Sequence, residues 1–183
     1  DIDIRTDIPS YNIYRNGKFD GSVADINKYW EEDSVAFVLG CSFSFEEALA
    51  QENVPLRHVE LERTCPMYKT SIETQKSGPF GGGMVVSMRP MPPSDAIRAS
   101  AITARFPHTH GMPVHIGNPI DIGIEDIDKP DWGDTTEFYQ GEVPVFWACG
   151  VTPQNAIKDA GIPFVITHTP GSMLITDKIS AIA

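Results

Sequence analysis

Two histidines and one cysteine of this sequence stand where an α/β protein presents side chains to a ligand. His115 lies inside a short strand-like stretch, and His168 follows the apolar run at 164–166. Histidine titrates near neutral pH, so this pair could supply the base and the acid of a proton-transfer reaction. Cys149 ends another apolar run. A thiol beside a helix N-terminus is more acidic than usual, although a cysteine in such a place is more often part of the core.

Four further residues could bind a carboxylate or an oxyanion. Arg89 ends a predicted strand and Arg105 ends a predicted helix, and a guanidinium can bind a carboxylate through two parallel hydrogen bonds. An exposed surface salt bridge is the competing interpretation for each arginine. Ser44 and Thr152 stand at predicted helix starts, where backbone N–H groups favour an anion.

Two other patterns point away from a metal or a nucleotide. His108, His110 and His115 form H-x-H-x4-H, but neither an HExxH helix nor paired cysteines accompany them. The glycine run at 78–83 lacks the GK[ST] ending of a phosphate loop, which favours a mobile flap. We therefore predict no metal and no cofactor.

The elements that must position these residues form two similar stretches. Residues 141–177 are typical of a strand, a tight turn, a helix and a second strand. Each position of 35–59 aligns without a gap with the position 108 residues later, and both stretches carry the same pattern. Ser44 and Glu47 form the S-x-x-E capping box. Internal duplication and a chance likeness between two βαβ units both stay open.

Strands and helices alternate along the rest of the chain. The Asn16-Gly17 dipeptide predicts a hairpin of two edge strands, residues 84–91 a strand and residues 95–105 a helix. The fold class is therefore α/β, with a mixed sheet, helices on both faces and two intertwined parts. We expect an α/β core from residues 1–63 and 141–183, with two βαβ-like units, and an inserted α+β subdomain at 64–140.

Composition narrows the function classes. The chain has 183 residues, 41% of them hydrophobic, and a net charge of −11, which argues against nucleic acid and an anionic membrane surface as partners. A small anionic substrate stays compatible, because it responds to the local site. Three cysteines without CxxC spacing favour a reducing compartment, so a cytoplasmic protein is expected. The chain begins without methionine, as a fragment or processed product would, and a homo-oligomer stays open.

Several strings of this sequence together resemble the D-glutamate cyclase family, also called hydro-lyases, in order and over nearly the whole chain. The strings are GCSFSFEEAL (40–49), PMYKT (66–70), MVVSMRPM (84–91), ITARFP (102–107), HGMPVHIGNP (110–119), GEVPVFWACGVTPQ (141–154) and ITHTPGSMLITD (166–177). The resemblance implies an α/β lyase that closes D-glutamate to 5-oxo-D-proline with loss of water. Such a reaction needs a base, an acid and an oxyanion site.

This chain departs from the family pattern at two positions. Thr74 stands where the family has a cysteine, and Ser172 stands where it has a histidine. The family also extends further at its N-terminus. Two alternatives follow, namely a hydro-lyase that acts on another small carboxylic acid and a non-catalytic binding module for such an acid. A binding module would keep the arginines and the helix N-termini, but it would not use a histidine pair as acid and base.

Overall fold

The computed structural model describes residues 2–177, which fold into two compact units. Of the described residues, unit 1 comprises 2–38, 75–82 and 153–177, and unit 2 comprises 39–74 and 83–152. The two parts are therefore intertwined along the chain, as expected. Their boundaries lie at other residues than the expected divisions after 63 and 140.

The described chain contains helices, 3-10 helices (η) and strands in the following order: β1 (Tyr11–Arg15), β2 (Lys18–Val23), η1 (Asn27–Tyr29), η2 (Ser42–Phe45), α1 (Glu46–Gln51), α2 (Arg57–Glu60), β3 (Met67–Glu73), β4 (Gly83–Met91), α3 (Pro93–Thr103), η3 (Pro107–Thr109), β5 (His115–Ile116), η4 (Pro119–Ile122), β6 (Val143–Ala148), α4 (Thr152–Asp159) and β7 (Phe164–His168). Within the described residues, no helix combines the length and the apolar character needed to cross a membrane.

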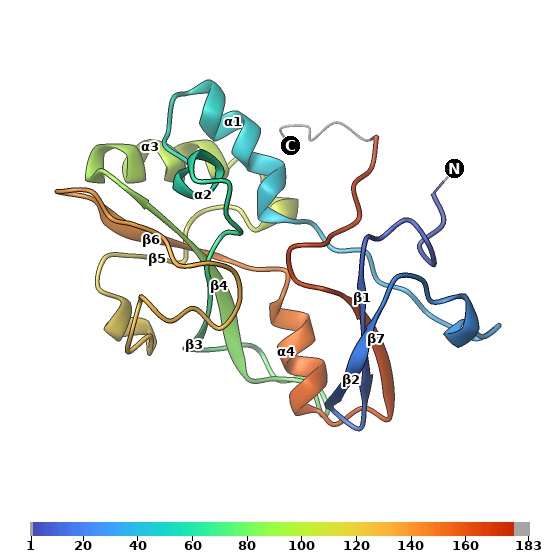
Figure 1. Cartoon of the computed structure of the whole chain (residues 1–183). Coiled ribbons are helices and arrows are strands. Elements are labelled where there is room, and N and C mark those ends of the chain that lie inside the picture. Colours follow the sequence, from blue (N-terminus) through green and yellow to red (C-terminus); the bar gives the residue numbers. More distant parts are fainter. Residues whose placement is uncertain (1, 178–183) are drawn as a thin grey trace. The chain divides into compact units, whose positions relative to one another are not determined.

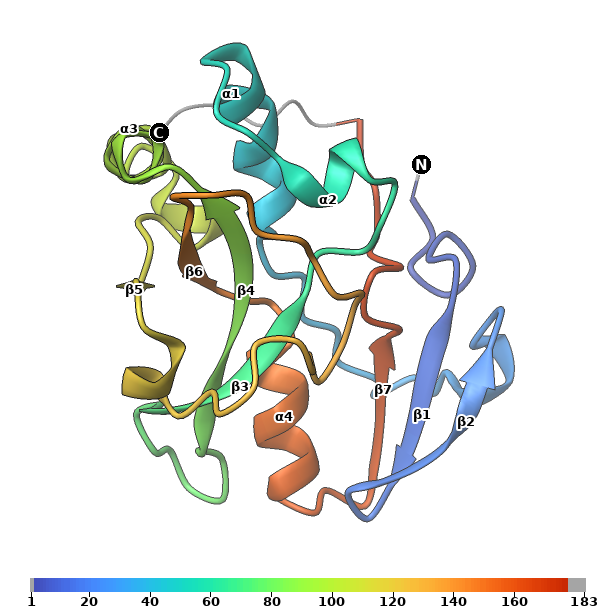
Figure 2. The same cartoon turned by 60° about the vertical axis from the view of Figure 1, so that its left-hand side comes forward.

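Unit 1 is built on a three-stranded antiparallel sheet in the order β2-β1-β7. The predicted hairpin at Asn16-Gly17 is confirmed, because both residues have positive φ, 50° and 72°, and Arg15 pairs with Lys18. Gly17 also lies against the end of α4, where a Cβ atom would come within 2.4 Å of the Lys158 carbonyl oxygen. Figure 2 shows this turn beside the C-terminal end of α4 and the start of β7.

Unit 2 is built on a four-stranded antiparallel sheet in the order β3-β4-β6-β5. In Figures 1 and 2, α1, α2 and α3 gather near the C-terminal end of β4. One face of the sheet packs against α1 and α3, through a core that includes Leu49, Ala99, Met91, Val145 and Trp147. We call this the helix face.

The other face of the same sheet is covered by the chain that follows η4. Val86, Met88 and Phe146 pack there with Ile122 and Ile124. Successive strand residues point to opposite faces, which is why Phe146 lies between Val145 and Trp147 in sequence but in a different core. We call this the loop face.

The α/β class is confirmed, with two antiparallel sheets in place of the expected mixed sheet. The internal duplication is not confirmed. The apolar residues Val35–Leu39 form no strand, and the Val35 and Phe37 side chains are 77% and 82% exposed. The later stretch gives the predicted strands β6 and β7, yet they belong to different sheets. The described residues therefore do not contain two equivalent βαβ units in one sheet. Periodicity reports that a segment is apolar and extended but does not identify its pairing partner.

Candidate active site

Arg89 lies on the helix face of the four-stranded sheet. Its partner on β6 is Val145, which belongs to the core under α1 and α3, and directly opposed residues of an antiparallel pair share a face. The Arg89 side chain is fully buried. A charged side chain in such a place requires partners that offset its lost hydration.

One carboxylate and two hydroxyl groups surround the Arg89 guanidinium. Nε and Nη2 donate to Glu46 Oε1 at 3.0 and 2.5 Å. Nη1 donates to Ser87 Oγ at 3.1 Å and Nη2 to Ser42 Oγ at 3.3 Å. His58 Nε2 lies 3.0 Å from the same Glu46 oxygen, close enough for an ion pair but outside hydrogen-bond geometry. We refer to these five residues as the Arg89 cluster.

Glu46 is the anion at the centre of this cluster. It is the first residue of α1 and follows η2 directly, so one bend of the chain supplies both Glu46 and Ser42. Burial acts to raise the pKa of Glu46, but His58 and Arg89 together outweigh it and leave this pKa below its usual value. Burial acts to lower the pKa of Arg89, and nearby negative charge more than restores it. Both groups are therefore charged at neutral pH.

Two turns that begin at cysteines lie beside the Arg89 cluster. The Ser44 N–H donates to the Cys41 carbonyl at 3.0 Å, and the Thr152 N–H donates to the Cys149 carbonyl at 3.0 Å. The two segments, 41–44 and 149–152, thus share one backbone hydrogen-bonding pattern. We call them the cysteine turns. This local likeness survives although the larger duplication does not.

Both cysteines of these turns are free thiols that are partly buried. Burial raises the pKa of Cys41, while the N–H groups of Phe43 and Ser42 and the charge of Arg89 act in the opposite direction. Burial likewise raises the pKa of Cys149 to about 11, against the effect of the Val151 N–H. Negative charge on Cys41 would add to this rise.

Glycines hold the cysteine turns close to neighbouring backbone. A Cβ atom on Gly40 would lie 2.1 Å from the His108 carbonyl oxygen, so no larger residue fits there without a shift. A Cβ atom on Gly150 would lie 3.8 Å from the Gly40 carbonyl oxygen, which is ordinary contact. The residue before Cys41 and the residue after Cys149 are therefore neighbours in space.

His110 borders the same region from the loop after η3. Its φ of 81° is rare for a residue with a side chain, and such conformations are concentrated at functional sites. Its Nε2 atom is buried without a hydrogen-bond partner. Burial and the nearby Arg89 charge lower the pKa of His110, against an opposing interaction with the Gly40 backbone. The neutral imidazole can thus accept a proton at neutral pH.

The structure brings two of the predicted site residues together and separates a third from them. Arg89 and Cys149 both belong to the helix face, because Arg89 pairs with Val145 and Cys149 continues the same alternation beyond β6. The His115 ring lies on the loop face, 5.7 Å from the ring of its partner Phe146. Its Nε2 lies 2.8 Å from the Asn118 carbonyl oxygen.

His168 belongs to unit 1, where it ends β7. Gln154 of α4 lies against it, with Nε2 3.4 Å from His168 Nδ1 and a hydrogen bond to the His168 carbonyl oxygen at 3.2 Å. Burial lowers the pKa of His168. The expectation that His115 and His168 share a cleft stays a prediction, since the two histidines lie in different units.

The predicted oxyanion donors are already engaged. Ser44 lies inside η2 and makes no side-chain cap to α1, so its predicted capping role is wrong. Thr152 starts α4, and its hydroxyl both accepts from the Val85 N–H at 3.0 Å and lies 3.1 Å from the Val85 carbonyl oxygen. Because the backbone N–H groups of Ser44 and Thr152 close the cysteine turns, an oxyanion could use them only after those turns open.

Arg105 lies just beyond α3 and is exposed. Its Nε donates to the Ile102 carbonyl oxygen at 3.4 Å, a long bond close to the limit of hydrogen-bond geometry. Unlike Arg89, this guanidinium keeps its charged end in solvent. It is therefore the predicted carboxylate-binding residue that an arriving anion could reach without breaking an internal ion pair.

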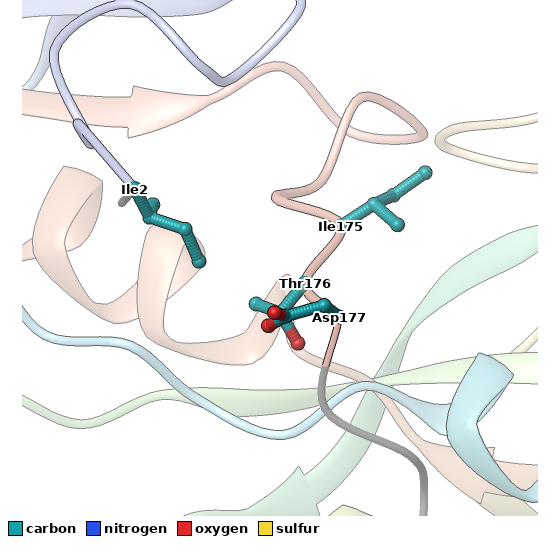
Figure 3. Close-up of a pocket in the computed structure, with 4 residues that line it drawn as sticks. All are labelled: Ile2, Ile175, Thr176 and Asp177. Carbon is teal, nitrogen blue, oxygen red and sulfur yellow. The ribbon is translucent and has the colours of Figure 1, made fainter.

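Neither a metal nor a deep pocket draws attention to another site. Among residues 2–177, no group of three or more His, Cys, Asp or Glu side chains is arranged to hold a metal ion, which leaves His108, His110 and His115 without a common centre. An open hollow of unit 1 is lined by Ile2, Ile175, Thr176 and Asp177 (Figure 3). Among the described residues that line it, Asp177 is the only charged one.

Sequence reasoning missed most of the Arg89 cluster. Glu46 stands next to Glu47, and the capping-box pattern directed attention to the second of these residues instead of the first. His58 lies in the four-residue helix α2, which is too short to give a periodic signal. Ser42 and Ser87 each add a single hydroxyl group to a segment whose structure is predicted from its apolar residues. Neither serine therefore stands out in the sequence. The useful signal was the single arginine inside the otherwise uncharged β4 stretch.

Comparisons with known proteins point to one family. The family described as D-glutamate cyclase matches residues 35–177. A Burkholderia orbicola protein named "Putative hydro-lyase" is 56% identical over 181 residues, which are 99% of this chain and 70% of that protein. A Bradyrhizobium diazoefficiens protein with a name of the same kind is 57% identical over 177 residues, 97% of this chain and 65% of that protein. For a Bordetella petrii relative the identity is 53% over 181 residues, 99% and 69% of the two chains.

Proposed function

Because the chain belongs to the D-glutamate cyclase family, we propose that it is a hydro-lyase that closes D-glutamate to 5-oxo-D-proline. The α-amine forms a bond to the δ-carbon, a C–O bond of the same carboxyl group breaks, and the oxygen leaves as water. The observation that carries this proposal is the family match over 35–177, which contains the whole Arg89 cluster and both cysteine turns.

The reaction makes three demands on the protein. A base must take a proton from the α-ammonium group, an acid must protonate the departing oxygen, and both ends of a flexible dicarboxylate must be held. His110 has the properties of the base, because its neutral ring keeps an unpartnered Nε2 atom. Cys149 has the properties of the acid, because a thiol with a pKa of about 11 keeps its proton at neutral pH.

Substrate carboxylates need cationic partners. Arg105 has its guanidinium in solvent and is our candidate for direct binding of a carboxylate. Arg89 would instead position other groups. Glu46 already accepts its hydrogen bonds, and this contact holds the bend of the chain that carries Cys41. His115 and His168, which the sequence nominated as base and acid, stay alternatives for the two proton transfers.

The test is the release of 5-oxoproline from D-glutamate, followed over time by NMR together with a panel of amino and hydroxy acids. We expect turnover of D-glutamate by the wild-type chain and a loss of about 100-fold or more in kcat for Cys149→Ser and His110→Gln, the range for general acid and base catalysis. Arg105→Ala should raise KM instead, because it should weaken the binding free energy of the carboxylate by about 1.5–3 kcal/mol.

Cys65→Ser is the matched cysteine control. Cys65 is fully buried, and its Sγ donates to the Met88 carbonyl at 3.4 Å, a bond that serine can keep. Its kcat should stay within about twofold of the wild type, since no proton-transfer group changes. Turnover of a hydroxy acid instead of D-glutamate would point to a different hydro-lyase. Tight binding of an acid without any turnover would point to a binding module.

A hydro-lyase that acts on another small carboxylic acid is the second candidate. It is favoured by the names of the relatives, which specify the loss of water but no substrate. The acid panel separates the two candidates, because each predicts a different preferred substrate with the same dependence on Cys149 and His110.

A further inference from the structure

The Glu46 carboxylate uses only one of its two oxygens inside the protein. Oε1 accepts from Arg89 Nε at 3.0 Å and from Arg89 Nη2 at 2.5 Å, and His58 Nε2 lies 3.0 Å from the same atom. Within residues 2–177, no donor forms a hydrogen bond to Oε2. An arginine often binds a carboxylate through two parallel bonds, one to each oxygen. The Arg89 cluster departs from that pattern and leaves Oε2 available.

A second buried glutamate of unit 2 shows the difference. Glu142 accepts from Arg57 Nη2 on Oε1 and from the Tyr139 N–H on Oε2, both at 2.8 Å, and its side chain is 5% exposed. The protein thus satisfies both of its oxygens, as is usual for buried polar atoms. The Glu46 side chain is 13% exposed, although Arg89 beside it is fully buried. Oε2 is also not one of the buried polar atoms without a partner, so it contacts solvent.

Contacts on two sides fix the direction of this free oxygen. Arg89 and His58 both hold Oε1 of Glu46, and the Phe43 ring stacks on the His58 ring with 6.0 Å between the centroids. Because the carboxylate cannot turn without breaking these contacts, Oε2 is a positioned acceptor. A ligand group with a positive charge and several N–H donors suits such an acceptor, and an ammonium group has both properties.

The proposed base lies beside the same bend of the chain. Gly40 packs against the His108 carbonyl oxygen, and η2, which leads into Glu46, contacts η3. His110 directly follows η3, and its Nε2 atom is buried without a partner. The bend at 40–46 therefore carries a free carboxylate oxygen and adjoins a free ring nitrogen. The first step of ring closure needs one group that holds an ammonium and one that takes a proton from it.

We propose that Glu46 Oε2 binds the α-ammonium group of the substrate and makes the site specific for amino acids. A hydroxyl group on the same carbon is neutral and has one donor, so a hydroxy acid forms a weaker bond to Oε2. An acid with only hydrogen on that carbon forms none. Ring closure converts the ammonium into a neutral amide N–H, so the product loses the charge-assisted bond and binds more weakly than the substrate.

This inference rests on the proposed function, because that function supplies the α-amino acid and the base. It deepens the function by assigning the ammonium group to one atom, Glu46 Oε2. A carboxylate of the substrate stays with Arg105, and the proton of the ammonium goes to His110. Of the two candidate hydro-lyases, the inference favours the one that acts on an amino acid.

The experiment measures the dissociation constants of D-glutamate, D-2-hydroxyglutarate and glutarate by ligand-observed NMR, which also detects 5-oxoproline in the same samples. The three acids share both carboxylates and differ only at the α-carbon. We expect the wild-type chain to bind D-glutamate about 10–100-fold more tightly than either of the other acids, the range for a hydrogen bond to a charged group. 5-Oxoproline should also bind more weakly than D-glutamate.

Two variants of Glu46 and one control locate the preference. Glu46→Gln keeps an acceptor for Arg89 but no negative charge, so D-glutamate should bind as weakly as glutarate, while glutarate binds no more weakly than before. Glu46→Asp keeps the charge beside Arg89 but withdraws the carboxylate by one methylene group, and it should also lose the preference. Glu47→Gln is the matched control, because this exposed neighbour only accepts from Gln51 Nε2 at 3.2 Å. It should keep the wild-type preference.

The outcomes separate this inference from the proposed function. Equal affinities of the wild type for D-glutamate and glutarate overturn the inference, and 5-oxoproline formed in that case leaves the hydro-lyase in place. A preference that survives in Glu46→Gln overturns it as well, provided that circular dichroism shows this variant to be folded. Where it is not folded, a preference that survives in Glu46→Asp has the same meaning. A preference that is lost with Glu46 supports the inference, and it contradicts the cyclase if no 5-oxoproline forms.

Discussion

His115 and Arg89 lie on opposite faces of the same four-stranded sheet. His115 pairs with Phe146 on the loop face, and Arg89 pairs with Val145 on the helix face. The partners of Arg89 and His115 are adjacent residues of β6, and adjacent strand residues point to opposite faces. The predicted carboxylate-binding group and the predicted proton-transfer group are therefore on different sides. The sheet itself lies between them.

The first prediction concerns His115→Gln. If His115 took part in proton transfer, kcat should fall by about 100-fold or more. Its place on the loop face leads us to expect a change in kcat of less than about tenfold, with a loss of about 1 kcal/mol of stability from the bond to Asn118. Steady-state kinetics and urea unfolding measure the two effects. A large fall in kcat with unchanged stability would support His115 as one of the two proton-transfer groups.

The second prediction concerns the buried ion pair. Removal of one partner leaves the other charge buried, so Arg89→Met and Glu46→Gln should each lower the free energy of unfolding by about 3–5 kcal/mol. The Arg98–Asp95 pair is exposed, with 46% and 19% of the two side chains accessible. Arg98→Met is therefore the matched control, with an expected loss of about 0–1 kcal/mol.

Urea denaturation monitored by tryptophan fluorescence measures these losses, since Trp147 lies in the helix-face core. The double variant Arg89→Met/Glu46→Gln should recover part of the loss, because it removes the unpaired charge. Equal and additive losses would mean that the pair contributes through packing alone.

The sequence predicts those elements of the fold that depend on local patterns, namely apolar runs and turn residues. The run Val143–Ala148 and the run 84–91 are apolar and bounded by turn residues, and both form central strands, β6 and β4. The Asn16-Gly17 turn is likewise determined by two adjacent residues. Local chemistry suffices for such elements, because their neighbours in sequence decide their conformation.

The part that the sequence does not predict depends on partners that are distant in the chain. The polar strand β3, with the residues Met67–Glu73, forms because β4 offers it a paired edge. Val35–Leu39 has the composition of a strand but remains extended and exposed. The helix predicted over residues 95–105 begins at Pro93, and its apolar residue Ile97 is 73% exposed.

The candidate site shows the same division. Arg89 and Cys149 lie on the same face of the sheet, and their part in binding a ligand stays a prediction. His58 escaped notice because its role comes from contact with Glu46. Glu46 escaped notice because its role comes from contact with Arg89, which lies 43 positions later in the chain. Pairings across that distance leave no trace in a single sequence.

The third prediction compares two glycines. Gly40→Ala places a methyl group 2.1 Å from the His108 carbonyl, so it should destabilise the protein by about 1–3 kcal/mol, the usual cost of overpacking. Gly150→Ala meets only ordinary contact at 3.8 Å and should leave the stability of the protein nearly unchanged. Thermal unfolding of the two variants checks this difference. Equal melting temperatures would contradict the packing of residues 107–110 against Gly40.

The fourth prediction concerns pH. Burial lowers the folded-state pKa values of His110 and His168 below 6.5, so the unfolded chain binds more protons than the folded chain as the pH falls through that range. Stability should therefore be full above about pH 6.5 and be lost as the pH falls through the folded pKa values. Unfolding free energies at several pH values should show this slope. His168→Gln should make it shallower.

The pairing of β1 with β7 has a consequence for synthesis of the protein. Tyr11 lies opposite His168, so β1 is completed by a strand that the ribosome makes much later. At about 5–20 residues per second, the ribosome needs about 8–30 s to produce the intervening chain. During that time the β1–β2 hairpin keeps an open edge. The yield of folded protein should thus depend on elongation speed and on chaperones that cover the nascent chain.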